Sequence, residues 1–147
     1  MEFKDLKQLE KFINSQMKDV LETTVFEEVK STMQSHIQSD VYEKYTPYST
    51  DGSTPHYERT YELMNSIEKK MESDNVLVVE NTRHEGNRDI VGVIEYGTGY
   101  QWGYKRNLDK EIGARPFVEN TIEDLSDGVK LNNAMKKGLK AKGISVE

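Results

Sequence analysis

The residues best suited to chemistry in this chain of 147 residues are three carboxylates, Glu80, Asp89 and Glu95, all on segments predicted to be strands. Two carboxylates facing each other across a cleft could work as a general acid and a general base. Their spacing in the sequence does not bring any two of them together, and structural carboxylates far outnumber catalytic ones. We therefore predict that the protein is not an enzyme. An acid/base pair around Glu95 is the alternative that remains open.

The other sequence signs of chemistry are weaker. His36, His56 and His84 are isolated and lack the spacing of metal ligands, and there is no cysteine. The segment Gly97-Thr98-Gly99 begins like a dinucleotide-binding loop, but the third glycine of that motif would fall at Trp102, where no helix is predicted to begin. We expect no catalytic residue, no metal and no cofactor.

Composition limits the class of protein. Hydrophobic residues make up 35% of the chain and charged residues 31%, which predicts a thin core that a partner surface helps to bury. The net charge of -6 argues against general nucleic-acid binding, which needs a basic surface. No apolar run approaches the ~20 residues of a membrane span, and the N-terminus lacks the apolar stretch of a signal peptide. We expect a soluble protein, made in a cytoplasm, with no membrane contact.

A long helix is predicted over residues 1–45. Apolar residues recur from Met17 to Tyr45 in steps of four, and such a row advances by about 40° per step around an α-helix. The helix therefore either breaks in the region of Ser31 to Ser35 or packs its two ends on different surfaces, and we favour the second interpretation.

The remaining segments predict a single α+β domain. A loop and approach rich in Tyr and Pro spans residues 46–65, an antiparallel sheet of about three strands spans 66–96, and a long aromatic loop spans 97–115. The second and third strands are apolar on both faces and should be buried on both. A helix is predicted over 116–141, interrupted near Gly128, and a tail over 142–147. Five lysines in the last 19 residues suit a helix C-terminus, and we expect a solvated, frayed end there.

All eight tyrosines lie in two windows of the sequence, residues 42–61 and residues 96–104, and the only tryptophan, Trp102, lies in the second. Tyr and Trp combine an apolar ring with a polar group and are enriched at interfaces, so we predict that these residues contact another subunit or a partner. The alternative is that the two loops pack on each other. The predicted interface residues are Tyr45, Tyr48, Tyr57, Tyr96, Tyr100, Trp102 and Tyr104.

Glu95 and Arg115 stand near the two ends of the aromatic loop. Glu95 follows Val91 and Val93 on one predicted strand face, and an unpaired buried charge costs several kcal/mol. An ion pair between Glu95 and Arg115 would join the end of the third strand to the start of the last helix. Arg59 is the other candidate partner, and an exposed glutamate at a strand end is the alternative. Pro116 suits the first helical turn, and Phe117 should pack there.

Three motifs in order, Leu63-x-x-Ser66-Ile67, Ile94-Glu95-Tyr96-Gly97-Thr98 and Arg115-Pro116-Phe117, resemble a tail-component family of tailed phages. The family is typified by a gene-ten product of lambdoid-type siphophages, and its members are neck, head–tail joining or tail-completion proteins. The resemblance spans residues 1–140. It departs from the family at Tyr61, where glycine is usual, and the loop over 99–114 is particular to this chain.

The resemblance implies a structural virion protein of the neck or tail, assembled in the host cytoplasm as a homo-oligomeric ring of six- or twelve-fold symmetry. Its partners would be other copies of itself, head-closure or adaptor proteins, and tail-terminator or tail-tube proteins. DNA would pass through without sequence-specific binding, because an acidic lumen repels phosphates. The alternatives are a tail terminator ring and, from another class, a small non-phage binding module with a pocket lined by Tyr96, Trp102 and Tyr104.

Overall fold

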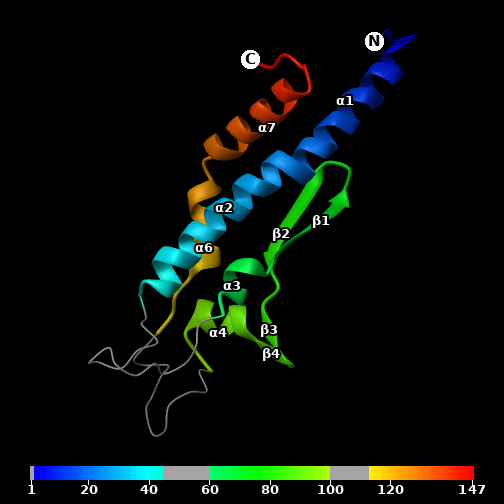
Figure 1. Cartoon of the computed structure of the whole chain (residues 1–147). Helices are drawn as coiled ribbons and strands as arrows, with labels where there is room; N and C mark the ends of the chain where they lie inside the picture. Colours follow the sequence, from blue (N-terminus) through cyan, green and yellow to red (C-terminus); the bar gives the residue numbers. More distant parts are fainter. Residues whose placement is uncertain (1, 45–59, 100–112) are drawn as a thin grey trace, which may run out of the picture. The chain divides into compact units, whose positions relative to one another are not determined.

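The computed structural model describes residues 2–44, 60–99 and 113–147 (Figure 1). Helices and short antiparallel strands follow one another in this single-domain chain, which confirms the predicted α+β class. Its contacts fall into two compact units. The first unit comprises Met1–Ser31, Glu68–Glu80 and Leu125–Glu147, and the second comprises Thr32–Ile67 and Asn81–Asp124.

The predicted N-terminal helix is continuous. It begins at Asp5, whose side chain accepts a hydrogen bond of 2.9 Å from the backbone N–H of Gln8 and so satisfies a donor that the first turn leaves open. Its four segments are α1 (Leu6–Val20), η1 (Leu21–Val25), α2 (Phe26–His36) and η2 (Ile37–Tyr42).

Two π-helical segments, η1 and η2, explain how the predicted row of four-residue steps stays buried. An α-helix has about 3.6 residues per turn, so a step of four residues goes slightly past a full turn. A π-helix closes its hydrogen bonds over i→i+5 and has more than four residues per turn, so the same step falls short of a full turn. The π-helical segments therefore turn the row back toward the side from which it moved away. Helix residues up to Ser31 belong to the first unit and those from Thr32 to the second, which confirms that the two ends pack on different surfaces. Four residues of the row are buried: Val25, Met33, Ile37 and Val41.

In the first unit, α7 (Val129–Ala141) packs on the N-terminal helix around a core of Val20, Val25, Ala134 and Leu139. Gly138 allows the close approach, because a Cβ at this position would overlap the side chain of Val20. The expectation of a frayed, solvated C-terminus was wrong for residues 129–141. Small and apolar residues on one side of α7 give this lysine-rich segment a face to bury.

A hairpin of β1 (Ile67–Ser73) and β2 (Val76–Asn81) completes the first unit from Glu68 to Glu80. Lys69 donates to the backbone carbonyl of Glu22, and its Nζ lies 4.9 Å from the centre of the Phe26 ring. The described part of this chain does not by itself bury β2 on both faces, since Val76 is 43% exposed and the next three residues are half-buried. The prediction that a neighbouring subunit covers the rest stays a prediction.

The second unit contains η2 and several short elements. Its strands β3 and β4 pair in antiparallel register, with His84 opposite Asp89 and Glu85 opposite Arg88. The short elements are α3 (Glu62–Asn65), β3 (His84–Glu85), β4 (Arg88–Asp89), α4 (Ile90–Tyr96) and α6 (Phe117–Leu125). The buried apolar residues of this unit are Met33, Ile37, Val41, Tyr42, Leu63, Ile67, Ile94 and Phe117.

The segment predicted as the third strand is helix α4. The side chain of Asp89 accepts a hydrogen bond of 3.1 Å from the backbone N–H of Gly92, which starts the helix, and Gly97 ends it with a φ of 70°. A continuous apolar run fits a buried strand and a buried helix equally well, and here the two caps decide. Two two-stranded sheets therefore replace the predicted sheet of three strands.

The predicted C-terminal helix over 116–141 is present as α6 and α7. Gly128, with a φ of 75°, separates them, which confirms the predicted interruption. Within the described ranges, no helix combines the length and the apolarity needed to cross a bilayer.

Candidate functional site

The candidate site is the base of the aromatic loop, where the end of α4 meets the residues before α6, all within the second unit. The backbone N–H of Arg115 donates to the carbonyl of Ile94 at 2.9 Å. Gly97 lies against the backbone of Gly113 and Ala114 so closely that a Cβ on it would overlap both. The chain therefore leaves the base near Gly97 and returns to the same point near Ala114.

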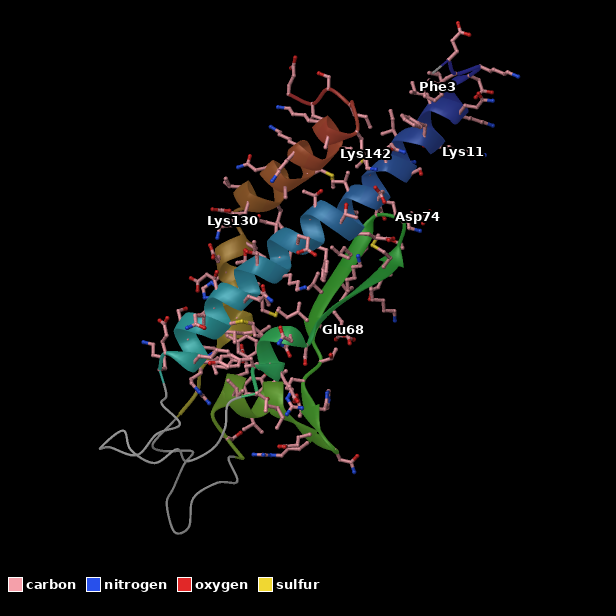
Figure 2. All side chains as sticks on the ribbon, in the orientation of Figure 1. Phe3, Lys11, Glu68, Asp74, Lys130 and Lys142 are labelled. Atoms are coloured by element: carbon pink, nitrogen blue, oxygen red, sulfur yellow. The ribbon has the colours of Figure 1, made fainter. Side chains whose placement is uncertain are left out.

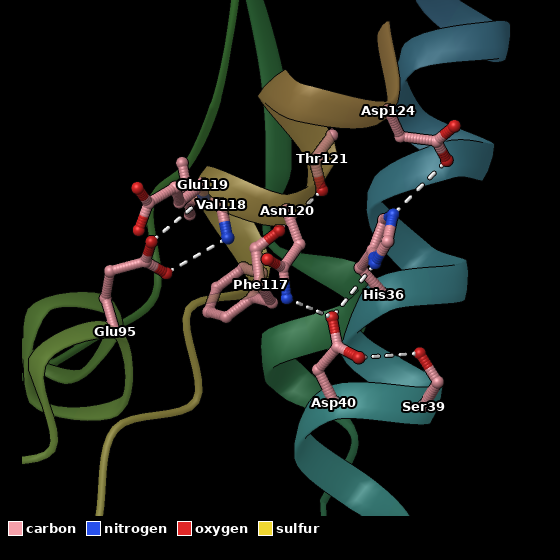
Figure 3. Close-up of polar contacts among 10 residues, drawn as sticks. All are labelled: His36, Ser39, Asp40, Glu95, Phe117, Val118, Glu119, Asn120, Thr121 and Asp124. Carbon is pink, nitrogen blue, oxygen red and sulfur yellow. Dashed lines mark hydrogen bonds and ion pairs between the residues drawn. The ribbon is translucent and has the colours of Figure 1, made fainter.

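Glu95 fixes the start of α6. Its Oε2 accepts the backbone N–H of Val118 at 3.0 Å, and its Oε1 accepts that of Glu119 at 2.9 Å (Figure 3). These are donors of the first helical turn, which have no partner inside the helix, and a carboxylate there also suits the positive end of the helix dipole. A side chain from α4 thus caps a helix that begins after the loop.

The predicted ion pair between Glu95 and Arg115 is replaced by two separate contacts with backbone. Glu95 uses both carboxylate oxygens on α6, while Nη1 of Arg115 donates to the carbonyl of Val41 at 3.2 Å. Arg115 is 9% exposed, and it reaches a carbonyl in the last turn of η2, where a cation suits the negative end of the dipole. Each residue thus holds one side of the base through a backbone partner of its own.

Phe117 packs as predicted, whereas Pro116 stands just before the helix and not within its first turn. Phe117 is the first residue of α6 and is fully buried, and the carbonyl of Pro116 accepts the backbone N–H of Asn120 at 2.9 Å. Pro116 itself is half-buried. Burying the Phe117 ring fixes the start of α6 beside the Glu95 carboxylate.

The predicted interface residues divide into one that the structure describes and six that lie outside the described residues. Tyr96, on the last turn of α4, is 75% exposed and stands beside the closed base. Its exposure is what a contact with another molecule needs. Those outside the described residues are Tyr45, Tyr48, Tyr57, Tyr100, Trp102 and Tyr104.

Tyr42 and Tyr61, from the first tyrosine window, pack on each other in the second unit. Their ring centres lie 5.4 Å apart with an interplanar angle of 88°, a favourable edge-to-face arrangement. Tyr61 has a φ of 60°, a conformation that glycine adopts at no cost. Tyrosine is strained in this conformation, and the ring contact with Tyr42 holds it there.

A polar cluster that the sequence analysis did not predict lies near the base, on η2, α2 and α6 (Figure 3). Nδ1 of His36 lies 2.9 Å from Oδ2 of Asp40, and Nε2 lies 3.2 Å from Oδ2 of Asp124. The amide of Asn120 donates to the same Asp40 oxygen at 3.0 Å. Only the first of these contacts has a sequence signal, the four-residue spacing of His36 and Asp40 on one helix.

The cluster holds Asp40 as a carboxylate. Burial would raise the pKa of Asp40, but hydrogen bonds from Asn120, His36 and Ser39 outweigh it and bring the pKa below its ordinary value. Both ring nitrogens of His36 face carboxylate oxygens, so both contacts are hydrogen bonds only when the ring is doubly protonated. The arrangement joins α6 to the N-terminal helix, and we interpret it as a structural clamp.

A groove of about 690 Å³ lies in the first unit, between α2 with η1 on one side and α7 on the other. Glu27 and Glu28 line one wall, Lys130 and Lys137 line the other, and Ala134 is the apolar residue of the lining. Small-molecule sites are mostly apolar and aromatic, so this groove does not suit such a ligand. Among the described residues, no group of three His, Asp or Glu side chains could hold a metal ion.

Comparison with known proteins places the chain in a family. Residues 5–141 match the YomN family, and the chain belongs to it. It is similar to the SPbeta prophage-derived uncharacterized protein YomN of Bacillus subtilis (strain 168), with 39% identity over 117 residues that cover 79% of this chain and 76% of that protein. No solved structure matches. The relation to a prophage-derived protein supports the phage origin expected from the sequence.

Proposed function

We propose that the protein is a structural virion protein of a tailed bacteriophage, a ring-forming neck or head–tail connector or a tail-completion component. The family relation supports a phage origin, and the ordered motifs carry the finer assignment. Two of these motifs meet at the base of the aromatic loop, Ile94-Glu95-Tyr96-Gly97 and Arg115-Pro116-Phe117. They therefore form one structural unit.

The observation that carries the proposal is the closed base of the aromatic loop. The Ile94–Arg115 hydrogen bond, the close approach at Gly97 and the cap by Glu95 fix both ends of the segment that holds Tyr100, Trp102 and Tyr104. Fixing both ends lowers the entropic cost of ordering the segment on a neighbour. The exposed ring of Tyr96 stands beside this base.

Apolar surface elsewhere in the first unit also supports assembly. On α1, Leu6 is 83% exposed, and Ile13 and Met17 are each 37% exposed. The rings of Phe3 and Phe12 lie 5.2 Å apart near the start of this helix (Figure 2). A subunit of a ring would bury such residues against its neighbours, as expected from the thin core.

The proposed ring consists of copies of this chain, in six- or twelve-fold symmetry, between head-closure or adaptor proteins and tail-terminator or tail-tube proteins. DNA slides through it without sequence-specific binding, and the acidic net charge suits that role.

The test is a phage from which the gene has been deleted, examined by electron microscopy. Full-length tails that fail to join filled capsids support the neck or tail-completion role. Tails of uncontrolled length would assign the protein to the terminator ring instead. Normal infectious particles, together with absence of the protein from purified wild-type particles, would overturn the proposal. Ligand binding by a monomer that never assembles would favour the non-phage binding module.

A further inference from the structure

The charge of this chain is divided unevenly along its length. The last 19 residues hold five lysines and one acid, Glu147. The whole chain carries -6, so removing this excess of four positive charges leaves -10 on the first 128 residues. A segment of opposite sign to the rest of the molecule is a surface that a second copy of the same molecule attracts.

Helix α7 presents this charge in an ordered way. At about 100° per residue, Lys130, Lys136, Lys137 and Lys140 fall within about a third of the circumference, together with Val129 and Asn133. The opposite side carries Ala134, Gly138 and Leu139, which are buried against the N-terminal helix. The lysines therefore lie on the side of α7 that is turned away from its buried residues.

Two contacts fix this helix. Gly138 brings its backbone against Val20, and Lys142 forms an ion pair with Asp19 of α1. Lys142 is thus used inside the unit. Lys137 lies at the rim of the groove but is exposed, as is Lys140, and Lys136 is half-buried. Val129, which is 56% exposed, adds an apolar point to this basic face.

A matching surface lies on α6. Its outer side carries Glu119 and Glu123, one helical turn apart, with Ile122 beside them. Ile122 is 64% exposed. Ile122 on α6 thus has carboxylates beside it, and Val129 on α7 has lysines beside it, so the two surfaces are complementary in charge. An exposed apolar residue surrounded by complementary charges is the usual composition of an interface centre.

We propose that the basic face of α7 binds the acidic outer face of α6 on a second copy of the chain. Two different surfaces are joined, so the contact is heterologous and generates a closed ring when the rotation between copies closes. The inference rests on the proposed function, because it supplies the contact from which the proposed ring is built. Nucleic acid is disfavoured as the occupant, because the remainder of the chain repels phosphate.

The experiment compares the full-length protein with a triple charge reversal, Lys136→Glu, Lys137→Glu and Lys140→Glu. Sedimentation velocity and native mass spectrometry measure self-association at low and moderate salt. We expect wild-type association to weaken with salt and the variant to associate on the order of tenfold to a hundredfold more weakly. A control reverses the exposed Lys44 and Lys70, which lie outside α7 and outside the apolar surface of α1. It should associate like the wild type.

A second arm makes the test specific. The pair Glu119→Lys and Glu123→Lys should also block self-association, and mixing it with the α7 variant should restore contact between the two proteins. Circular dichroism checks that each variant is folded. Wild-type association in the α7 variant, or an equal loss in the control, would overturn the inference. So would a lysine-dependent affinity for a labelled DNA duplex with unchanged self-association.

These outcomes are separable from those of the proposed function. A wild-type protein that stays monomeric at all concentrations overturns the α7–α6 contact. The proposed function fails only if the particles lack the protein and form normally without it.

Discussion

Glu95 lies 23 residues before Val118 in the sequence, yet its carboxylate accepts the backbone N–H of Val118 at 3.0 Å. A side chain before the aromatic loop therefore sets the first turn of the helix after it. The role assigned to Glu95 is that of a helix cap, and this differs measurably from that of an ion-pair partner.

The first prediction concerns this cap. Glu95→Gln should lower the free energy of unfolding by about 1 kcal/mol, because a charged acceptor of two backbone donors is lost, and Glu95→Ala by about 2 kcal/mol. Urea denaturation measures both. A Glu95/Arg115 double-mutant cycle should be additive to within about 0.5 kcal/mol. A strong coupling between the two residues would restore the ion pair as the correct description.

The second prediction concerns Gly97. Gly97→Ala should destabilise the fold by about 3 kcal/mol or more, because a φ of 70° is strained for alanine and the new Cβ overlaps the backbone of Gly113 and Ala114. Gly143→Ala is the matched control. It has a φ of 80° with nothing within 4 Å, so it should cost only about 1 kcal/mol. Equal losses for the two variants would mean that the close approach carries no weight.

The third prediction concerns pH. The pKa of Asp40 is lower in the folded protein than in the unfolded chain, so its contribution is present above the unfolded pKa, near 3.9. That contribution is lost as the pH falls through the folded pKa. Asp40→Asn should therefore be less stable than the wild type at neutral pH and should show a smaller loss of stability below about pH 4. Thermal unfolding from pH 2 to 7 measures this, with the exposed Asp74→Asn as the control. Identical acid slopes for Asp40→Asn and the wild type would contradict it.

The fourth prediction concerns the aromatic loop. Replacing Tyr100, Trp102 and Tyr104 with serine should leave the monomer folded and block assembly, because contacts of Glu95, Gly97 and Arg115 fix the base. Circular dichroism reports the fold, and native mass spectrometry reports the assembled state. Unfolding of the monomer would show that the three residues belong to the core.

The sequence predicted the fold well where long periodic patterns act. The N-terminal helix, the 66–82 hairpin and the break at Gly128 are all present, and the last helical region begins one residue after the predicted Pro116. It misassigned residues 90–96, because a short apolar run of β-branched residues has no period and the decisive caps, Asp89 and Gly97, are single residues at its ends.

The sequence singled out Glu95 and Arg115 but predicted an ion pair between them. Each contacts backbone groups instead, which no side-chain pattern reveals. The contacts of His36 with Asp124 and of Asp40 with Asn120 escaped prediction for a related reason. They join residues that lie 88 and 80 positions apart, and only the folded chain brings them together.

The hydrogen bond between Ile94 and Arg115 closes the base, so the segment between them can be exchanged without changing the base. Its two ends are fixed at neighbouring points, so lengthening or shortening it changes the entropy of loop closure only slightly, by about 0.6 kcal/mol for each doubling. The loop can therefore diverge in length and sequence between related proteins while the rest of the second unit stays the same. A single scaffold could in this way be matched to different neighbours by exchanging one segment.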